Sequence, residues 1–324
     1  MKNTYRWGIL GAGKIAEKFA SALNYTDGAS VSAIASRDEG RGKAFAERHG
    51  ASRVYTDYHK LALDPEIDIV YIALPHAFHC EQALHCLQHK KPVLCEKPMA
   101  LNLEQVNRLA DAAHRNQTFL MEGMWSRFMP SICKMLDWIK EDIIGQVLYV
   151  RADFGFEAPL EPQGRLFNLE LGGGSLLDVG IYTVFLTTLV LGEPVRVQSM
   201  ARLGATGADE YCSMQFQYAG GEVASLFSSI TIRTPLTAEI SGSKGRILLQ
   251  CPFYKATSIS LELFNGERNE LHFPHEHNGF EYQIREVMAC LDRGYMECPL
   301  MPLDFSLRMA RTIEEVKGQC GIVY

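Results

Sequence analysis

The first residues with types and spacing that indicate chemistry form a glycine-rich run near the N-terminus, Gly11-Ala12-Gly13-Lys14-Ile15-Ala16. Gly11 permits a tight turn, Gly13 lets a ligand approach the backbone, and the small Ala16 lets a strand and a helix pack closely. The run follows an apolar segment, 5–10, and opens an amphipathic one, 14–23, so it joins a predicted strand to a predicted helix. Phosphates bind well at such a helix N-terminus. The run predicts a dinucleotide site.

The end of the second predicted strand, 31–36, indicates which dinucleotide. An NAD enzyme usually has a carboxylate there for the adenosine ribose, whereas this chain has Ser36 followed by Arg37. A hydroxyl and a guanidinium suit a 2′-phosphate, and Arg41 lies one helical turn further on. These residues favour NADP, and NAD remains the alternative, with Asp38 serving the ribose.

Two further segments follow predicted strands at the carboxyl edge of the sheet, where ligands of open α/β sheets bind. Cys95-Glu96-Lys97-Pro98 follows strand 93–95, and its lysine can reach the nicotinamide side of the cofactor. Pro75-His76-Ala77-Phe78-His79 follows strand 69–74 and is expected to form a wall of the nicotinamide pocket. A third metal ligand of matching spacing is absent from the sequence around the two histidines, so no metal is expected.

A second glycine-rich run, Gly172-Gly173-Gly174, opens a long apolar helix expected at 175–191. Asp178 and Tyr182 are four residues apart, so they lie on one face of an α-helix and can point into the same cavity. Polar groups on so apolar a helix must find partners. The alternative is a core tyrosine with a hydrogen-bonded hydroxyl.

These residues need two kinds of scaffold to position them. Up to about Gly123, short apolar strands alternate with amphipathic helices, which predicts a doubly wound parallel sheet. After that point extended segments follow one another through turns, with few helices, which predicts an antiparallel sheet. We therefore expect an α/β protein with an N-terminal Rossmann domain, 1–123, and a C-terminal α+β domain, 124–324, with a large, mainly antiparallel, open-faced sheet. The C-terminal helix is able to pack back on the Rossmann domain.

Four motifs in order along the chain carry a family resemblance. They are the glycine-rich start, Glu96-Lys97-Pro98, the run from Met121 to Pro130, and the glycine-rich loop that leads to Tyr182. Together they resemble the glucose-fructose oxidoreductase / inositol dehydrogenase (Gfo/Idh/MocA) family over essentially the whole chain. Many members have histidine at the position of Tyr182. With a tyrosine at this position, the chain is similar to the branch of dimeric dihydrodiol dehydrogenases and NADP-dependent D-xylose 1-dehydrogenases.

The resemblance implies an NADP(H)-dependent oxidoreductase that transfers a hydride to or from a CH–OH or C=O carbon of a sugar, cyclitol or trans-dihydrodiol. It implies that Tyr182 is the acid/base, Lys97 its electrostatic partner, and Asp178 the group that orients them. Reduction of a carbonyl gives its oxygen alkoxide character, so a proton donor must lie within hydrogen-bond reach. An ammonium nearby stabilises the phenolate that the oxidative direction requires.

The remaining expected site residues fall into two sets. The expected cofactor-binding residues are Gly11, Ala12, Gly13, Lys14, Ile15, Ser36, Arg37, Arg41, Leu74, Pro75, His76, His79, Glu96, Lys97 and Arg127. The expected substrate pocket consists of Trp125, Phe154, Asp178, Tyr182, Tyr254 and Phe280.

Composition excludes several other classes of protein. The 324 residues are 47% apolar and 22% charged with a net charge of −6, and no basic block offers a surface for nucleic acid. No signal-peptide pattern or charge-free membrane span is evident, so a cytoplasmic location is expected. The nine scattered cysteines include no C-x-x-C pair and are interpreted as buried or incidental thiols. By analogy with the family we expect a homodimer through the C-terminal sheet, or a tetramer of two such dimers. The alternative function is a non-catalytic NAD(P)-binding regulator of the same fold.

Overall fold

The first apolar segment of the chain becomes an interior strand of a parallel sheet in the computed structural model, which describes residues 4–324. This six-stranded sheet has the order β3-β2-β1-β4-β5-β6. Because the chain starts at β1, winds outward through β2 and β3, and returns to β4, the order reverses between β1 and β4. The strands are β1 Tyr5–Leu10, β2 Ala29–Ala35, β3 Arg53–Tyr55, β4 Ile69–Ile72, β5 Val93–Glu96 and β6 Leu120–Gly123. This confirms the predicted doubly wound sheet.

Amphipathic helices connect these strands because their apolar positions recur at helical spacing. They are α1 Lys14–Tyr25, α2 Glu39–His49, α3 Tyr58–Leu63, α4 His79–Gln88 and α5 Leu103–Asn116. Phe19 of α1 stacks on Tyr71 of β4 with ring centroids 3.6 Å apart and meets Trp7 of β1 edge-on at 5.4 Å. Aromatic burial thus ties the first helix to the two strands at the point where the order reverses.

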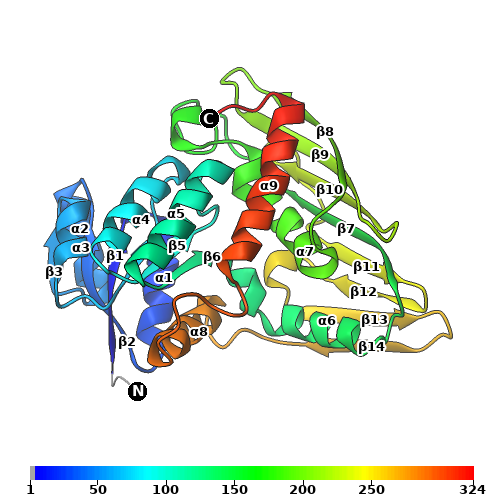
Figure 1. The fold of residues 1–324 in the computed structure, drawn as a ribbon, viewed down its shortest axis with the longest axis horizontal. Coiled ribbons are helices and arrows are strands. Elements are labelled where there is room, and N and C mark those ends of the chain that lie inside the picture. Colours follow the sequence, from blue (N-terminus) through cyan, green and yellow to red (C-terminus); the bar gives the residue numbers. More distant parts are fainter. Residues whose placement is uncertain (1–3) are drawn as a thin grey trace. The chain divides into compact units, whose positions relative to one another are not determined.

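The chain folds into two compact units. The first is the chain up to Trp125 together with Glu276–Ser306, and the second is Ser126–His275 with Leu307–Tyr324. Helix α8, Phe280–Asp292, belongs to the first unit, where Phe280 meets Phe19 edge-on at 5.9 Å. Each unit contains one of the two sheets (Figure 1).

The second unit contains an eight-stranded sheet with the order β14-β13-β12-β11-β7-β10-β9-β8. Its strands are β7 Val147–Gly155, β8 Arg196–Leu203, β9 Asp209–Gln217, β10 Val223–Ser229, β11 Ala238–Gly242, β12 Gly245–Leu249, β13 Ser258–Leu263 and β14 Arg268–His272. Every pair is antiparallel except β7 with β10. The mainly antiparallel sheet is therefore confirmed, with one parallel pair where β10 returns to β7 in the middle of the sheet.

Helices α6 Pro130–Lys140 and α7 Ile181–Leu191 complete this unit, together with α9 Leu303–Cys320 from Leu307 onward (Figure 1). Gln319 of α9 accepts a hydrogen bond from the Ser199 backbone N–H and donates one to the Val197 carbonyl, both 2.8 Å long. One side chain thus hydrogen-bonds to two backbone groups of β8, which is an edge strand of the sheet. The segment Leu169–Leu191 has the length and composition of a membrane span, yet 83% of its apolar window is buried inside the structure, as in the core helix of a globular protein.

Three local details differ from the sequence-based expectation. Strand β3 and helix α3 were not predicted, since they are three and six residues long and the three residues of β3 are all only half-buried. The helix expected at 175–191 begins as a π-helical turn, Leu176–Gly180, before α7. Asp178 lies in that turn, so its spacing to Tyr182 is not the simple α-helical one that the sequence suggested.

Candidate active site

The first glycine-rich run turns tightly between β1 and α1. Gly11 has φ +99°, and a Cβ there would lie 2.6 Å from the Ala73 carbonyl oxygen. Any other residue would therefore clash with the backbone that directly follows β4. A Cβ built on Gly13 meets nothing within 4 Å, which leaves open space in front of the helix. Ala12 lies between them, and Lys14 and Ile15 begin α1. The backbone is thus exposed to a ligand at the predicted position.

The N-terminus of helix α1 has no side-chain cap, unlike the N-termini of α2, α3 and α5. Asp38, Asp57 and Asn102 cap α2, α3 and α5 with side-chain hydrogen bonds to backbone N–H groups. The N-cap residue of α1 is Gly13, which has no side chain to offer. The first N–H groups of α1 therefore remain available for phosphate oxygens, and this helix end fits a dinucleotide pyrophosphate.

The residues expected to select NADP lie close to this turn. The Arg41 guanidinium donates a hydrogen bond of 3.3 Å to the Ala12 carbonyl, so its charge reaches the glycine-rich run. Ser36 is buried at the end of β2, and the Arg37 guanidinium lies 5.5 Å from the Phe78 ring centroid. Asp38, the alternative ribose ligand, instead caps α2 through Oδ1, which accepts the Arg41 N–H at 2.9 Å.

The segment after β4 is held in place by His79. The imidazole is fully buried, and its two nitrogens lie 2.8 Å from the carbonyl oxygens of Leu74 and Pro98. Burial lowers the pKa of His79, although its contacts with the two carbonyl oxygens oppose this shift. With both nitrogens facing carbonyl oxygens, this ring joins the turn after β4 to the turn after β5. Pro75 and the buried His76 lie in the same segment.

Glu96 and Lys97 lie at the carboxyl end of β5. The Glu96 carboxylate is buried and accepts hydrogen bonds from the Tyr71 hydroxyl, at 2.5 Å, and from the Lys97 backbone N–H, at 3.3 Å. Desolvation raises the pKa of Glu96 to about 7, although the Tyr71 hydrogen bond and the Lys97 charge oppose the rise. Lys97 is only half-buried, so the lysine is accessible at this edge while the preceding carboxyl is not.

Glu122 is a second buried carboxyl at the same edge of the sheet, and the sequence analysis did not assign it a role. It lies on β6, opposite Cys95 of β5. Its oxygens accept the Met99 N–H at 2.9 Å and the Ser306 hydroxyl at 2.6 Å. Desolvation raises its pKa. Glu122 thus anchors the turn that follows Lys97, and its position near the end of a strand was the signal available in the sequence.

Two residues expected in the substrate pocket belong to the first unit. Trp125 and Phe280 stack with ring centroids 4.3 Å apart and an interplanar angle of 5°. Phe280 is 1% exposed and Trp125 is 7% exposed. The pair continues the aromatic packing of Phe19, so Phe280 contributes to the core of this unit.

The other aromatic residues of the expected pocket come together in the second unit. Phe154, at the end of β7, stacks on Tyr254 with centroids 4.5 Å apart and an interplanar angle of 9°. The Tyr182 ring lies 5.5 Å from Phe154 and 5.2 Å from Tyr254. Two aromatic side chains that are 100 residues apart in the sequence therefore flank the Tyr182 phenol. Arg127, half-buried in a 3₁₀ turn, belongs to the same unit.

Asp178 has a partner that the sequence analysis missed. Arg165 Nη1 donates a hydrogen bond of 2.7 Å to Asp178 Oδ1, with the carboxylate buried and the guanidinium about half exposed. Arg165 comes from the long connection between β7 and the second glycine-rich run, where no local pattern marks it. A charge-assisted hydrogen bond of this kind fixes the carboxylate in one orientation.

The second glycine-rich run is shaped by Asp209. This buried carboxylate accepts the Ser175 hydroxyl at 2.8 Å and the Leu176 N–H at 2.7 Å through Oδ2. Gly174 has φ +126°, and a Cβ there would lie 2.0 Å from Asp209 Oδ1. Burial raises the pKa of Asp209 to about 6. The glycine is therefore required for Asp209 to hold the start of the π-helical turn that carries Asp178.

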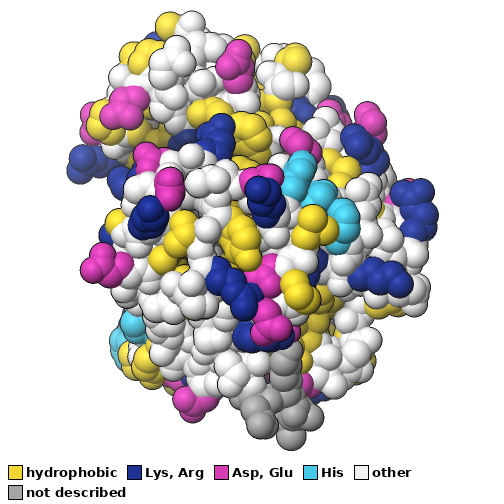
Figure 2. Space-filling view, turned by 90° about the vertical axis from the view of Figure 1, so that its left-hand side faces the viewer, with side chains coloured by type: hydrophobic (Ala, Val, Ile, Leu, Met, Phe, Trp, Pro, Cys, Tyr) yellow, Lys and Arg dark blue, Asp and Glu magenta, His cyan; other side chains and the backbone are white. Residues whose placement is uncertain are grey.

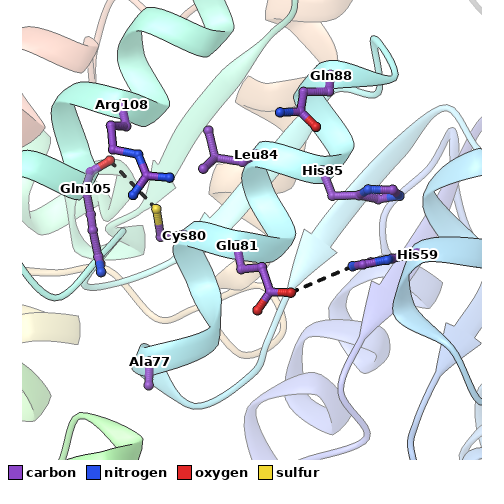
Figure 3. Close-up of a pocket in the computed structure, with 9 residues that line it drawn as sticks. All are labelled: His59, Ala77, Cys80, Glu81, Leu84, His85, Gln88, Gln105 and Arg108. Atoms are coloured by element: carbon purple, nitrogen blue, oxygen red, sulfur yellow. Dashed lines mark hydrogen bonds and ion pairs between the residues drawn. The ribbon is translucent and has the colours of Figure 1, made fainter.

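A hollow elsewhere on the first unit contains none of the expected site residues. It has a volume of about 370 Å³ and lies among α3, α4 and α5 (Figure 3). Its lining mixes His59, Glu81, His85 and Arg108 with apolar side chains. The view in Figure 2 shows Lys and Arg side chains scattered among Asp and Glu side chains on that face of the molecule, with no single basic block.

Comparison with known proteins identifies the family. Residues 5–124 match the model of an oxidoreductase family with an NAD-binding Rossmann fold, and residues 132–248 match the GFO/IDH/MocA C-terminal domain. The trans-1,2-dihydrobenzene-1,2-diol dehydrogenase of Xenopus tropicalis is 38% identical, over 98% of this chain and 99% of the relative. The chain belongs to the Gfo/Idh/MocA family of oxidoreductases. The human dehydrogenase of the same name is 33% identical, over 98% of each chain.

Solved structures of the Gfo/Idh/MocA fold superpose along the whole chain. A 3-ketoreductase from Actinomadura kijaniata, in complex with NADP and TDP-benzene, has a TM-score of 0.88 at 27% identity and covers 98% of both chains. A levoglucosan dehydrogenase has a TM-score of 0.90 at 17% identity, over 98% of this chain and 97% of the other, and shows the fold alone. These comparisons confirm the predicted family, the predicted fold class and the predicted activity of an NAD(P)-dependent oxidoreductase.

Proposed function

We propose that this protein is an NADP(H)-dependent oxidoreductase that acts on a CH–OH or C=O carbon of a sugar, cyclitol or trans-dihydrodiol. The nicotinamide, when bound, supplies or accepts the hydride. The dehydrogenase of Xenopus tropicalis, 38% identical, is named for a trans-dihydrodiol, and the 3-ketoreductase was solved with NADP. In this proposal residues 1–123 carry the cofactor and residues 124–324 carry the substrate.

The preference for NADP is supported by the arginines beside the glycine-rich run. Arg41 already directs its guanidinium to the Ala12 carbonyl, and Arg37 lies at the end of β2. An arginine fork matches the oxygens of a 2′-phosphate, whereas a ribose diol is usually held by a carboxylate. Asp38, the carboxylate in this segment, caps α2 instead. NAD should therefore bind less tightly than NADP.

The observation that carries the catalytic proposal is the setting of Tyr182, a buried phenol enclosed by the rings of Phe154 and Tyr254. In our proposal the Tyr182 hydroxyl donates its proton to the substrate oxygen as the carbonyl is reduced, and accepts it back in the oxidative direction. The surrounding rings exclude water, which strengthens the hydrogen bond that the phenol makes to a developing alkoxide.

Two charged groups assist Tyr182 in this proposal. The Lys97 ammonium stabilises the phenolate that forms when the proton leaves. Asp178, fixed by Arg165 at 2.7 Å, orients the polar groups around the substrate hydroxyl. Two further expected cofactor ligands, Glu96 and Arg127, position the nicotinamide end of the cofactor and the phosphates attached to it.

The aromatic cluster also favours one kind of substrate. Phe154 and Tyr254 are stacked nearly parallel, so together they present flat apolar surface beside the Tyr182 hydroxyl. A compact ring with one apolar face and one face of hydroxyl groups fits such a wall. This description fits both a cyclic dihydrodiol and the hydrophobic face of a pyranose.

A substitution at Tyr182 tests the acid/base assignment. Tyr182→Phe should keep the affinity for NADPH, measured by fluorescence titration, and lose about 10²- to 10⁴-fold in kcat, the usual contribution of a positioned proton donor. The matched control is Tyr254→Phe, which removes the hydroxyl from the neighbouring ring and should retain most of the turnover. A Tyr182→Phe variant with wild-type kcat would reject the assignment.

Lys97→Met separates two roles of the lysine. Loss of kcat with NADPH affinity preserved would support the electrostatic role, whereas weaker NADPH binding with kcat preserved would show that Lys97 is only a cofactor anchor. The assay is absorbance of the reduced nicotinamide with a panel of pentoses, hexoses, cyclitols and aromatic trans-dihydrodiols, each with NADP⁺ and NAD⁺. Binding of NADPH without turnover of any compound in the panel would favour the alternative function, a non-catalytic NAD(P)-binding regulator.

We also propose that the protein is cytoplasmic and that two copies associate through the outer face of the eight-stranded sheet. On that face Tyr211 and Phe227 stack with centroids 5.9 Å apart. Around them lie pairs of opposite charge, including Arg151 with Glu239 and Arg246 with Glu262. A face with aromatic residues, arginines and both signs of charge is complementary to its own copy across a two-fold axis.

Sedimentation velocity tests this association. The wild type should sediment as a dimer, or as a tetramer of two dimers, and Phe227→Arg should shift it towards monomer. Leu63→Arg, which changes an exposed apolar residue at the end of α3 in the first unit, is the control and should leave the assembly intact. A wild type that sediments only as monomer would refute the proposal.

A further inference from the structure

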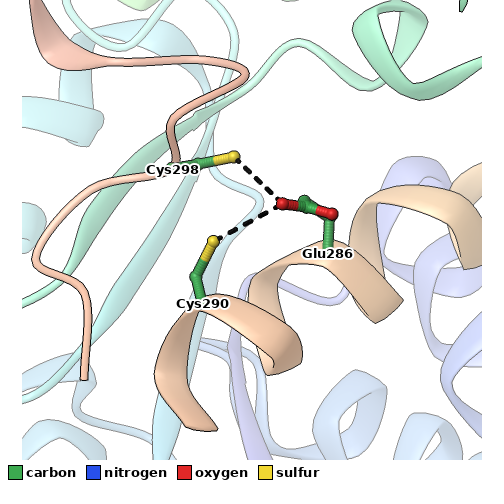
Figure 4. A group of neighbouring side chains, drawn as sticks. All are labelled: Glu286, Cys290 and Cys298. Atoms are coloured by element: carbon green, nitrogen blue, oxygen red, sulfur yellow. Dashed lines mark hydrogen bonds between the residues drawn. The ribbon is translucent and has the colours of Figure 1, made fainter. Parts of the chain in front are cut away.

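Two cysteines and a glutamate that have no role in the proposed catalysis converge in the first unit. Glu286 and Cys290 lie one turn apart on α8, and Cys298 lies in the loop that follows (Figure 4). The Glu286 Oε1 atom is 3.7 Å from Cys290 Sγ and 3.8 Å from Cys298 Sγ. All three donor atoms lie within 4.8 Å of one another. They therefore face a common point.

The spacing of these donors matches tetrahedral coordination of a small divalent cation. With metal–sulfur bonds of about 2.3 Å and metal–oxygen bonds of about 2.0 Å, a tetrahedral angle separates sulfur and oxygen by about 3.5 Å. The observed separations of 3.7 and 3.8 Å exceed this value by only a few tenths of an ångström. A cation at the common point would draw the side chains together without backbone movement.

Backbone N–H groups lie around the Cys298 sulfur. The backbone N–H groups of Leu300 and Met301 hydrogen-bond to its sulfur, and the Met301 N–H also bonds the Cys298 carbonyl at 3.0 Å, which closes a tight turn. Amides directed at sulfur are the usual outer contacts of a metal-bound thiolate.

We propose that Glu286, Cys290 and Cys298 bind a thiophilic divalent cation of the Zn²⁺ type, with water as the fourth ligand. Two sulfur ligands disfavour Mg²⁺ and Ca²⁺, and the carboxylate disfavours Cu⁺. Each thiol that becomes a ligand releases its proton to solvent, so binding of the cation releases up to two protons. Both sulfurs are buried, and the half-buried Glu286 provides the route from solvent.

The site has a structural consequence in this proposal. The cation ties the last turn of α8 to the Cys298 turn, which directly precedes α9. The loop between the two cysteines is mostly exposed, including Tyr295 at 42%. Cross-linking its ends should stabilise the first unit, since the cation binds only the folded arrangement. The role is independent of hydride transfer.

Cobalt provides the direct test. Full-length protein is reduced, treated with a chelator, freed of both reagents under anaerobic conditions, and titrated with Co²⁺. Wild-type protein should develop a sulfur-to-cobalt charge-transfer band in the near ultraviolet, together with visible bands of tetrahedral intensity, that saturate at one equivalent. Zn²⁺ should abolish these bands by competition, with proton release measured by an indicator dye.

Variants assign the site. Cys298→Ser should lose the charge-transfer band, and Glu286→Gln, which keeps the shape of the side chain, should bind Co²⁺ at least about a hundredfold more weakly, since even outer contacts of a metal site cost 10- to 100-fold. Cys133→Ser, which changes a half-buried cysteine of the second unit, is the control and should bind like wild type.

Three results would overturn the proposal. They are a wild type without the charge-transfer band, a band unchanged by Cys298→Ser and Glu286→Gln, and a Cys290–Cys298 disulfide in air-oxidised protein whose reduced form does not bind Co²⁺. A wild type that gains thermal stability with Zn²⁺, while Glu286→Gln gains none, would support it even if the cysteine variants fail to fold.

Discussion

Glu96→Gln should change how stability depends on pH, because this buried carboxyl titrates differently in the folded and unfolded protein. Burial raises its pKa from the ordinary value of 4.5 to about 7. Between those two values the folded protein keeps the Glu96 proton while the unfolded chain has lost it. By proton linkage the free energy of unfolding therefore falls as pH rises through this interval.

The size of the effect follows from the two pKa values. The interval from 4.5 to about 7, at about 1.4 kcal/mol for each pH unit, corresponds to about 3 kcal/mol. The contribution is fully present below pH 4.5 and is lost once the pH exceeds about 7. Glutamine cannot ionise, and its carbonyl can still accept the Tyr71 hydroxyl. The Glu96→Gln protein should therefore lack this loss.

The assay is urea unfolding at several pH values from 4.5 to 8, followed by tryptophan fluorescence. As pH rises across this range, the unfolding free energy of Glu96→Gln relative to that of wild type should increase by about 3 kcal/mol. A constant offset from the altered hydrogen bond does not affect this change. Glu104→Gln, at an exposed position in the first turn of α5, is the control and should run parallel to wild type. A Glu96→Gln curve that also runs parallel to wild type would refute a raised Glu96 pKa.

Three further outcomes are expected. Arg41→Ala should weaken NADPH binding by about 10- to 100-fold, the equivalent of one charge-assisted hydrogen bond, with NADH little affected; equal losses for both cofactors in fluorescence titrations would contradict a 2′-phosphate contact. Arg165→Met should lower kcat by about tenfold through misplacement of Asp178 while NADPH affinity is unchanged, and wild-type steady-state kinetics would contradict this role. Gly174→Ala should destabilise the protein by at least about 2 kcal/mol in thermal unfolding, because its Cβ would collide with Asp209. Gly221→Ala is the control: Gly221 also has a positive φ but has open space around it, so this change should cost about 1 kcal/mol. Similar losses in both variants would contradict the steric argument.

Most of the fold could be predicted from the sequence because the strongest signals are local. Alternation of apolar strands and amphipathic helices specified the parallel sheet, and Gly11 and Gly13 placed the dinucleotide turn at its interior strand. Strand β3 was missed because three half-buried residues carry no periodicity. The parallel pairing of β10 with β7 was missed because it depends on contacts between segments about 70 residues apart, which no turn signal records.

The candidate site could be predicted only where residues sit in motifs. Asp178 and Tyr182 follow a glycine-rich run on an expected helix, and Phe154 was named through the family resemblance, so all three could be predicted. Arg165 lies in an irregular connection, and its contact with Asp178 exists only in three dimensions. The π-helical turn was not predicted either; its first residue, Leu176, donates its backbone N–H to Asp209, which is remote in sequence.

The contact between Gln319 and β8 has a consequence for how this sheet behaves in a crowded solution. An unoccupied strand edge is a template on which another extended chain can hydrogen-bond. Here an amide side chain takes the Ser199 N–H and the Val197 carbonyl, so an incoming peptide finds those positions filled. In the folded protein, lateral growth of the sheet into a continuous ribbon is blocked at this border.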